Sequence, residues 1–139
     1  MLCYVGIMAQ KILLVDDDQY IREVYEEVLK DAGFIVDTAA DGASALEKIK
    51  KGGYDLILLD LVMPKTDGLG VLTALSKNPP LQKNGPIILL TNLAQDQRMQ
   101  EAIRNGATSY IIKSDITPAD LIENVNKFLK PDSIGAKED

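Results

Sequence analysis

An unbroken apolar run that ends in a single carboxylate is the feature that most constrains this fold. Leu56-Ile-Leu-Leu59 is followed at once by Asp60. Such a run is typical of a strand buried on both faces, as in a parallel sheet covered by helices. Pro64 cannot extend a strand ladder, and Asp67-Gly68 is a turn pair. Asp60 is therefore expected where a central strand leaves the core, although a carboxylate there also fits a simple loop cap.

Apolar runs and amphipathic segments alternate along the rest of the chain. The runs predict strands over residues 11–15, 34–38, 55–60, 86–91 and 109–113. The helices are expected from Asp18 or Gln19 to Ala32, from Asp41 to Gly52-Gly53, from Gly68 to Ser76, from about Gln95 to Asn105, and from Thr117 to just before Pro131. Five strands alternating with five helices predict an α/β fold, a doubly wound parallel sheet.

The chain is predicted to form one domain, because its 139 residues contain no linker or repeat. We expect an N-terminal extension at 1–9, the domain at 10–130 and a polar C-terminal tail at 131–139. The first apolar residues lack the positive region of a signal peptide, and either Met1 or Met8 fits as the start.

Composition excludes several functional classes. The net charge of −6 argues against non-specific nucleic-acid binding, and we find no DNA-binding element. Cys3 is the sole cysteine, which favours a cytoplasmic, reducing setting. No apolar run approaches the roughly 20 residues of a membrane span. The absence of histidine excludes a histidine triad, a histidine metal site and a phosphohistidine on this chain.

Polar residues follow four of the predicted strands: Asp16 and Asp17, Asp60, Thr91, and Lys113. All should open on one edge of a parallel sheet. Clustered carboxylates repel one another unless a cation joins them, and carboxylate oxygens suit Mg²⁺. A carboxylate can also attack phosphorus to give an aspartyl phosphate. A metal ion, an ammonium and a hydroxyl would then stabilise the three phosphoryl oxygens.

Four motifs occur in order along the chain: Val15-Asp-Asp17, Leu59-Asp60-Leu-Val-Met-Pro64 with Asp67-Gly68, Leu90-Thr91, and Gly106-Ala-Thr-Ser-Tyr-Ile-Ile-Lys113. Together they resemble the receiver domain of bacterial two-component response regulators. The resemblance covers about residues 10 to 130 and is to single-domain, chemotaxis-regulator-like members. It implies the flavodoxin-like strand order 2-1-3-4-5.

The resemblance also implies a role for each site residue. Asp60 would be the phosphoacceptor, with Thr91 and Lys113 binding the phosphoryl group. Mg²⁺, with Mn²⁺ as the expected substitute, would be held by Asp16, Asp17, Asp60 and the Val62 backbone carbonyl. Tyr110 would be a switch residue that follows Thr91, although it also fits simple packing on a strand. The phosphoryl donor would be a sensor histidine kinase or a histidine phosphotransfer protein. The output would be an unidentified partner or phosphorylation-dependent self-association.

The sequence departs from the family pattern at two places beside these residues. Ser114 follows Lys113 where the family usually has proline after a cis peptide bond, so the peptide is either trans with a rearranged loop or cis under strain. Asn92 follows Thr91 where a small residue is usual, and it would narrow access or add a hydrogen bond. In the family that the chain resembles, the positions of Val62 and Leu93 tune hydrolysis of the phosphoryl group. Both residues are apolar here and cannot orient an attacking water molecule, which predicts a long-lived phosphoryl group.

Two alternative functions fit part of the pattern. Asp16-Asp17-Asp18 superficially matches the nucleophile motif of haloacid-dehalogenase-like phosphatases, but the other acidic pair and the length of that family are missing. A receiver-like module that binds partners without phosphorylation is the other. We expect a phosphoacceptor rather than a turnover enzyme, and we expect Asp18 to cap a helix rather than bind metal.

Overall fold

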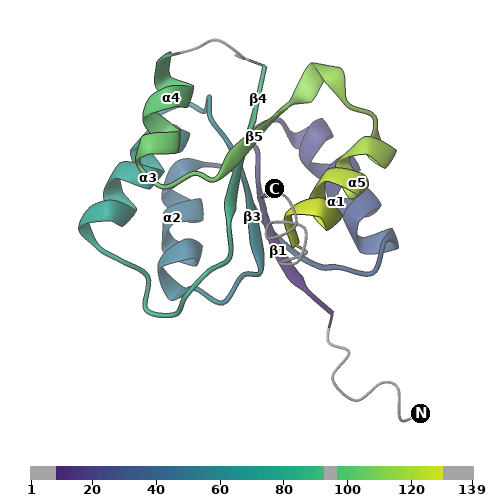
Figure 1. Cartoon of the computed structure of the whole chain (residues 1–139), viewed down its shortest axis with the longest axis horizontal. Coiled ribbons are helices and arrows are strands. Elements are labelled where there is room, and N and C mark those ends of the chain that lie inside the picture. Colours follow the sequence, from purple (N-terminus) through teal and green to yellow (C-terminus); the bar gives the residue numbers. More distant parts are fainter. Residues whose placement is uncertain (1–8, 93–96, 130–139) are drawn as a thin grey trace, which may run out of the picture.

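The structure is a computed structural model that describes residues 9–92 and 97–129. Its strands and helices alternate along the chain (Figure 1). In chain order they are β1 (Lys11–Val15), α1 (Gln19–Asp31), β2 (Ile35–Ala39), α2 (Gly42–Lys51), β3 (Leu56–Asp60), α3 (Gly68–Lys77), β4 (Ile87–Thr91), α4 (Gln97–Arg104), β5 (Ser109–Ile112), the short 3-10 helix η2 (Lys113–Asp115) and α5 (Pro118–Leu129). Among the helices described here, none has the length and apolar character needed to cross a membrane.

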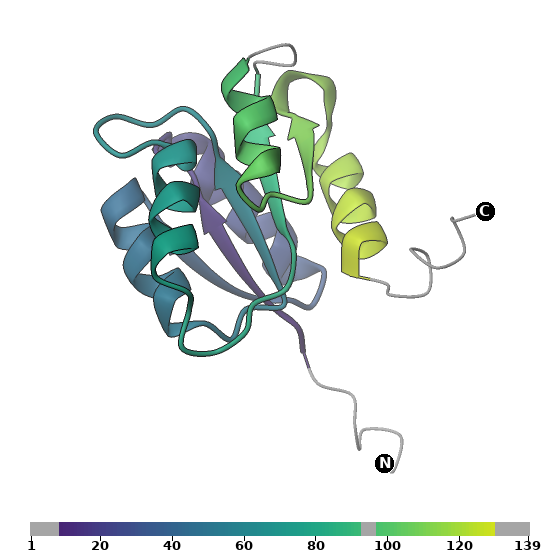
Figure 2. The ribbon, with the colours of Figure 1, turned by 60° about the vertical axis from the view of Figure 1, so that its left-hand side comes forward.

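The five strands form one parallel sheet in the order β2-β1-β3-β4-β5. This confirms the predicted doubly wound architecture and its 2-1-3-4-5 strand order. Helices α1 and α5 cover one face of the sheet, and α2, α3 and α4 cover the other (Figures 1 and 2). Parallel strands all end at one edge, so the residues that follow them are brought together there.

Alternation along the central strands explains why they are apolar throughout. In β1, Ile12 and Leu14 pack with α1 and α5, whereas Leu13 and Val15 pack with α2, α3 and α4. In β3 the Leu56–Leu59 run divides between the two faces in the same way, and all four side chains are fully buried. A strand covered on both faces has no solvent side, so every position must be apolar until it leaves the core.

Side-chain caps fix where the helices begin. Asp18 accepts a hydrogen bond from the Ile21 amide at 3.1 Å, which confirms its predicted role at the start of α1. Asp41 and Asp67 cap α2 and α3 in the same manner. At α5, Thr117 and Asp120 exchange the two hydrogen bonds of a capping box.

The loop after β3 folds back tightly against the end of that strand. The Gly68 amide donates to the Leu61 carbonyl at 3.0 Å. A Cβ atom at Gly68 would lie 2.7 Å from the Asp60 carbonyl oxygen and 2.9 Å from the Leu61 Cα. Both separations are too short for a side chain, so glycine is required for α3 to start this close to Asp60.

Several predicted boundaries differ from the structure. Strand β5 ends at Ile112 rather than at Lys113, which begins η2 instead. Helix α1 buries Tyr25 and Leu29 most deeply, and the neighbouring Val28 is only partly covered. The predicted start of α4 near residue 95 and most of the two terminal extensions lie outside the described residues.

A polar network ties β2 to α2 and to the start of β3. The Tyr54 hydroxyl donates to one oxygen of Asp37 at 2.8 Å, and Lys48 donates to the other at 2.9 Å. Partial burial raises the pKa of Asp37, but hydrogen bonds from Lys48 and Tyr54 outweigh that effect, so the pKa lies below its usual value. The ionised carboxylate therefore contributes stability that is lost as pH falls through this lowered pKa.

We predict that Tyr54→Phe lowers the free energy of unfolding at neutral pH by roughly 1 kcal/mol, because it removes a donor to a partly exposed carboxylate. The deficit should shrink in acid, where Asp37 is protonated. Chemical denaturation at several pH values measures it, with Tyr20→Phe as the control because that ring is 76% exposed. An equal effect of the two substitutions would contradict the assignment.

Candidate functional site

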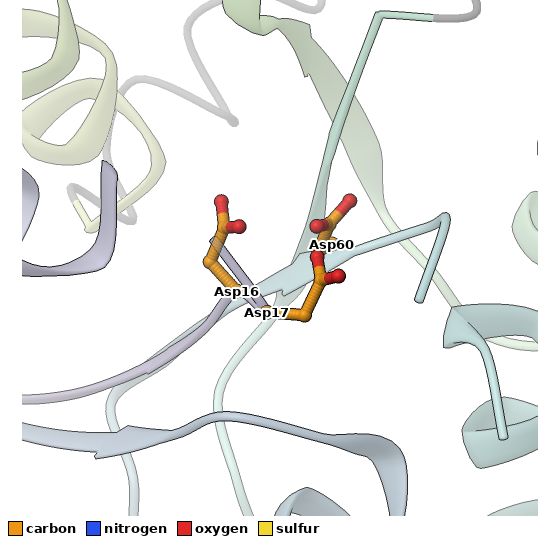
Figure 3. Close-up of side chains that lie close together, drawn as sticks. All are labelled: Asp16, Asp17 and Asp60. Carbon is orange, nitrogen blue, oxygen red and sulfur yellow. The ribbon is translucent and has the colours of Figure 1, made fainter. Parts of the chain in front are cut away.

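Three carboxylates meet at the carboxyl edge of the sheet, at the ends of two neighbouring strands. Asp16 and Asp17 follow β1, and Asp60 is the last residue of β3. The two strands are paired, with Val15 opposite Leu59, so the acids leave the sheet side by side. One oxygen from each carboxylate lies within 4.8 Å of the others (Figure 3). Asp16 and Asp60 are buried, whereas Asp17 is exposed.

Lys113 reaches into this acidic cluster from the first position of η2. Its ammonium lies 3.1 Å from Asp16 Oδ2 and 3.3 Å from Asp60 Oδ2. The lysine side chain is only 12% exposed, and the two carboxylates it contacts are less exposed still. A buried ion pair needs good geometry and further hydrogen bonds to offset desolvation, and this site provides both.

Backbone groups hold the two buried carboxyl residues. Asp16 Oδ1 accepts from the Asp18 amide at 2.9 Å, and Asp60 Oδ1 accepts from the Val62 amide at 3.2 Å. The Arg22 guanidinium donates to the Asp16 carbonyl at 2.7 Å, which fastens the first turn of α1 to the end of β1. No pattern in the sequence indicates this contact, because a charged residue in the first turn of a helix does not show which carbonyl group it will reach.

Burial sets the electrostatics of the site. Desolvation raises the pKa of Asp60 to about 7; the Lys113 ammonium opposes this shift, and the neighbouring Asp16 adds to it. Burial would lower the pKa of Lys113, but Asp60 and Asp16 reverse that effect and raise it. The lysine therefore stays charged, whereas burial makes ionisation of the Asp60 carboxyl group less favourable.

The donor set of this cluster fits a hard divalent cation. All three side chains offer carboxylate oxygens, the ligands that Mg²⁺ takes in proteins alongside water. A cation would also relieve the repulsion between the acids. Asp17 is exposed, so the cluster is open to solvent on that side. The Val62 amide donates to Asp60, so the residue whose carbonyl is the predicted ligand follows this carboxylate closely in the loop.

Thr91 lies on the neighbouring strand and is also buried. It is the last residue of β4, which pairs with β3 on one side and β5 on the other. Thr91 is 1% exposed and stands opposite Ile112, the residue before Lys113. The two residues predicted to bind a phosphoryl group thus leave adjacent strands at the same level.

Two other predicted residues are partly exposed to solvent. Tyr110 on β5 is 44% exposed, and the Val62 side chain is 45% exposed. The Lys113–Ser114 peptide is trans, which resolves the two alternatives left open by the sequence. Asn92 accepts a hydrogen bond from the Ser114 amide at 2.9 Å, one of the two outcomes considered for this residue. Leu93 lies outside the described residues.

A family model and two similar known proteins match this chain to the same family. A family model described as the response regulator receiver domain matches residues 12–126. The chemotaxis protein CheY of Halobacterium salinarum is 36% identical over 106 residues, which cover 76% of this chain and 86% of that protein. The chemotaxis protein CheY of Treponema pallidum is 32% identical over 123 residues, covering 86% and 83% of the two chains.

Solved structures agree with this assignment. The Vibrio cholerae chemotaxis protein CheY4 superposes with a TM-score of 0.75 at 33% identity, covering 88% of this chain and 100% of that chain. The receiver domain of a Pseudomonas aeruginosa sensor histidine kinase, solved with magnesium coordinated in its active-site cleft, gives 0.74 at 30% identity, with 88% and 98% covered. Other relatives are longer: the chain spans 49% of the Staphylococcus aureus transcriptional regulatory protein SrrA and 7% of a Dictyostelium discoideum hybrid histidine kinase.

The raised pKa of Asp60 predicts a stability effect in metal-free protein. A folded pKa of about 7 lies above the unfolded value, so the native state binds more protons and loses stability as pH rises from about 4 to 7. Asp60→Asn removes this titration and should gain stability relative to wild type over that window, by up to about 4 kcal/mol.

Thermal unfolding in EDTA across this pH range measures the difference, with the exposed Asp31→Asn as a matched control. Saturating Mg²⁺ should narrow the gap, because a ligand that binds only the native state stabilises wild type. A difference between wild type and Asp60→Asn that does not change with pH would contradict the electrostatic account.

Proposed function

The chain belongs to the response regulator receiver domain family, and on this premise we propose that Asp60 accepts a phosphoryl group and thereby switches a partner-binding surface. The observation that carries the proposal is the contact of Lys113 with both Asp60 and Asp16, beside a buried threonine. A carboxylate, an ammonium and a hydroxyl thus lie at one edge of the sheet, which supports the proposal. The family is one of signalling modules, and we propose a protein modified once per signal rather than a turnover enzyme.

The proposed reaction moves one phosphoryl group. An oxygen of the Asp60 carboxylate attacks phosphorus, an oxygen–phosphorus bond forms, and the nitrogen–phosphorus bond of a phosphohistidine breaks. The leaving imidazole nitrogen takes up a proton. The donor histidine would lie outside these 139 residues, because they contain no histidine. The relatives named above include two histidine kinases that contain receiver segments, which supports a kinase or a phosphotransfer protein as the donor.

The residues around Asp60 would stabilise the charge on the phosphoryl oxygens. The Lys113 ammonium lies 3.3 Å from an Asp60 oxygen. From there it would bind one of the negatively charged oxygens of a phosphoryl group on Asp60. The Thr91 hydroxyl would donate to a second oxygen. Asp16, Asp17, Asp60 and the Val62 carbonyl would hold Mg²⁺, which supplies positive charge and orientation for phosphoryl transfer when bound. Mn²⁺ should serve in its place.

The signal would leave the site through Thr91 and Tyr110. Once the carboxylate carries a phosphoryl group, Thr91 gains a new partner at the end of β4. Tyr110 on the adjacent strand is partly exposed before phosphorylation and would rotate inward as Thr91 moves. The surface altered in this way would bind an output protein or a second copy of the chain. The complete set of acids, threonine and lysine argues against a module that works without phosphorylation.

We expect incubation with acetyl phosphate and Mg²⁺ to add the mass of one phosphoryl group to the wild-type protein. Asp60→Asn should show no gain, because it lacks the nucleophile. Intact-mass spectrometry measures both. Asp55→Asn, which removes an exposed acid at the opposite end of β3, is the matched control and should still be phosphorylated. An equal gain in wild type and Asp60→Asn would refute the proposed phosphoacceptor.

We also predict slow loss of the phosphoryl group, with a half-life of minutes or longer in Mg²⁺ alone. Neither Val62 nor Leu93 has a polar group to orient an attacking water. Val62→Glu should shorten the half-life, since a carboxylate at this partly exposed position can hold such a water. Leu81→Glu serves as the control because that side chain is 90% exposed in the loop before β4. Hydrolysis of the wild-type adduct within seconds would contradict this prediction.

A further inference from the structure

A hydrogen bond joins the two loops that follow the phosphoryl-binding strands. The Ser114 amide donates to Asn92 Oδ1 at 2.9 Å. Asn92 is the residue directly after Thr91, and Ser114 is the residue directly after Lys113. The bond therefore connects the two positions immediately beyond the residues that would grip the phosphoryl group.

This hydrogen bond links two chain segments just beyond the point where β4 and β5 stop pairing. Strands β4 and β5 are paired only as far as Thr91 and Ile112. Beyond that level Lys113 turns away into η2, and the pairing of the two backbones ends. The Asn92 side chain restores a link between the two chain segments one step past the last paired residues. A bond between Asn92 and Ser114 limits how far Thr91 and Lys113 can separate.

The hydrogen bond needs an acceptor on residue 92 and a backbone N–H group on residue 114. Only the carbonyl end of an asparagine amide can accept a hydrogen bond from an N–H group, so Asn92 Oδ1 must face Ser114. Ser114 offers this N–H because it is not proline, and proline has none. The two departures of this sequence from the family pattern thus form the two halves of one contact.

We propose that Asn92 is a positioning residue that sets the separation of Thr91 and Lys113 around Asp60 through its hydrogen bond to Ser114. The inference rests on the proposed phosphoacceptor function. Phosphoryl transfer depends almost entirely on the placement of charge and donors around the moving group. Phosphorylation and hydrolysis of the adduct use the same Thr91 and Lys113 donors. A link that positions these donors should therefore act on both rates by a similar factor.

The alternative role of Asn92 is steric, and it predicts a different result. A bulky side chain beside the pocket would slow the entry of a phosphodonor without affecting donor placement. Removing the bulk would then speed phosphorylation. Asn92→Leu keeps the size and loses the acceptor, whereas Asn92→Ala loses both. The two variants separate positioning from access.

We expect Asn92→Leu and Asn92→Ala each to lower the rate constants of phosphorylation by acetyl phosphate and of adduct hydrolysis by the same factor, about two- to tenfold. Amide hydrogen exchange at Ser114, followed by NMR, should be faster in both variants than in wild type. Asn92→Asp retains the acceptor and should restore exchange protection at Ser114. The exposed Asn126→Leu is the matched control for an asparagine-to-leucine change, and thermal unfolding verifies that every variant is folded.

Three results would overturn the proposal. Unchanged rates in Asn92→Leu despite faster exchange at Ser114 would show that the hydrogen bond exists but does not position Thr91 and Lys113. Faster phosphorylation in Asn92→Ala with unchanged hydrolysis would show control of access. Absence of exchange protection at Ser114 in wild type would remove the link itself. Failure of wild type to be phosphorylated on Asp60 would instead overturn the proposed function, and the exchange measurement would still test the hydrogen bond alone.

Discussion

The cluster of buried charge around Asp60 is the constraint on which the site depends. Asp16 and Asp60 lie almost without solvent at the ends of two central strands, and their repulsion is offset by one ammonium group. Lys113 comes from far along the chain, so this compensation exists only once β5 has joined the sheet beside β4. The carboxyl group that would react is thus kept in an environment that opposes its ionisation, with the compensating lysine in direct contact.

Much of this arrangement could be predicted from the sequence because it follows from strand periodicity. The Leu56–Leu59 run predicts a strand covered on both faces, and Asp60 at its end predicts a carboxylate at the edge of the sheet, although that residue alone also fits a loop cap. A parallel topology then predicts Asp16, Thr91 and Lys113 at the same edge, because all strands of such a sheet end there. The strand order came from the family resemblance and not from the pattern alone, since periodicity does not say which strands are neighbours.

The details that escaped prediction are those decided by contacts between segments distant in sequence. Nothing local indicates that Arg22 fastens the end of β1, or that Lys113 leaves the strand to begin a 3-10 turn. Leu29 is buried more deeply than its neighbour Val28, because the orientation of α1 against the sheet decides which side of its apolar stripe faces the core. A hydrogen bond from Asn92 was one of two expectations, but the sequence does not show that Ser114 is its partner, because the two residues lie in separate loops.

The division of the core into two clusters has a consequence for how such a molecule can diversify. Residues of β1 and β3 contribute alternately to the layer beneath α1 and α5 and to the layer beneath α2, α3 and α4, and the two sets share no side chain. The sheet backbone is a partition between them. One layer can therefore accumulate substitutions and acquire a new outer surface while the packing of the other layer stays unchanged. The acidic edge is held by the sheet backbone in either case.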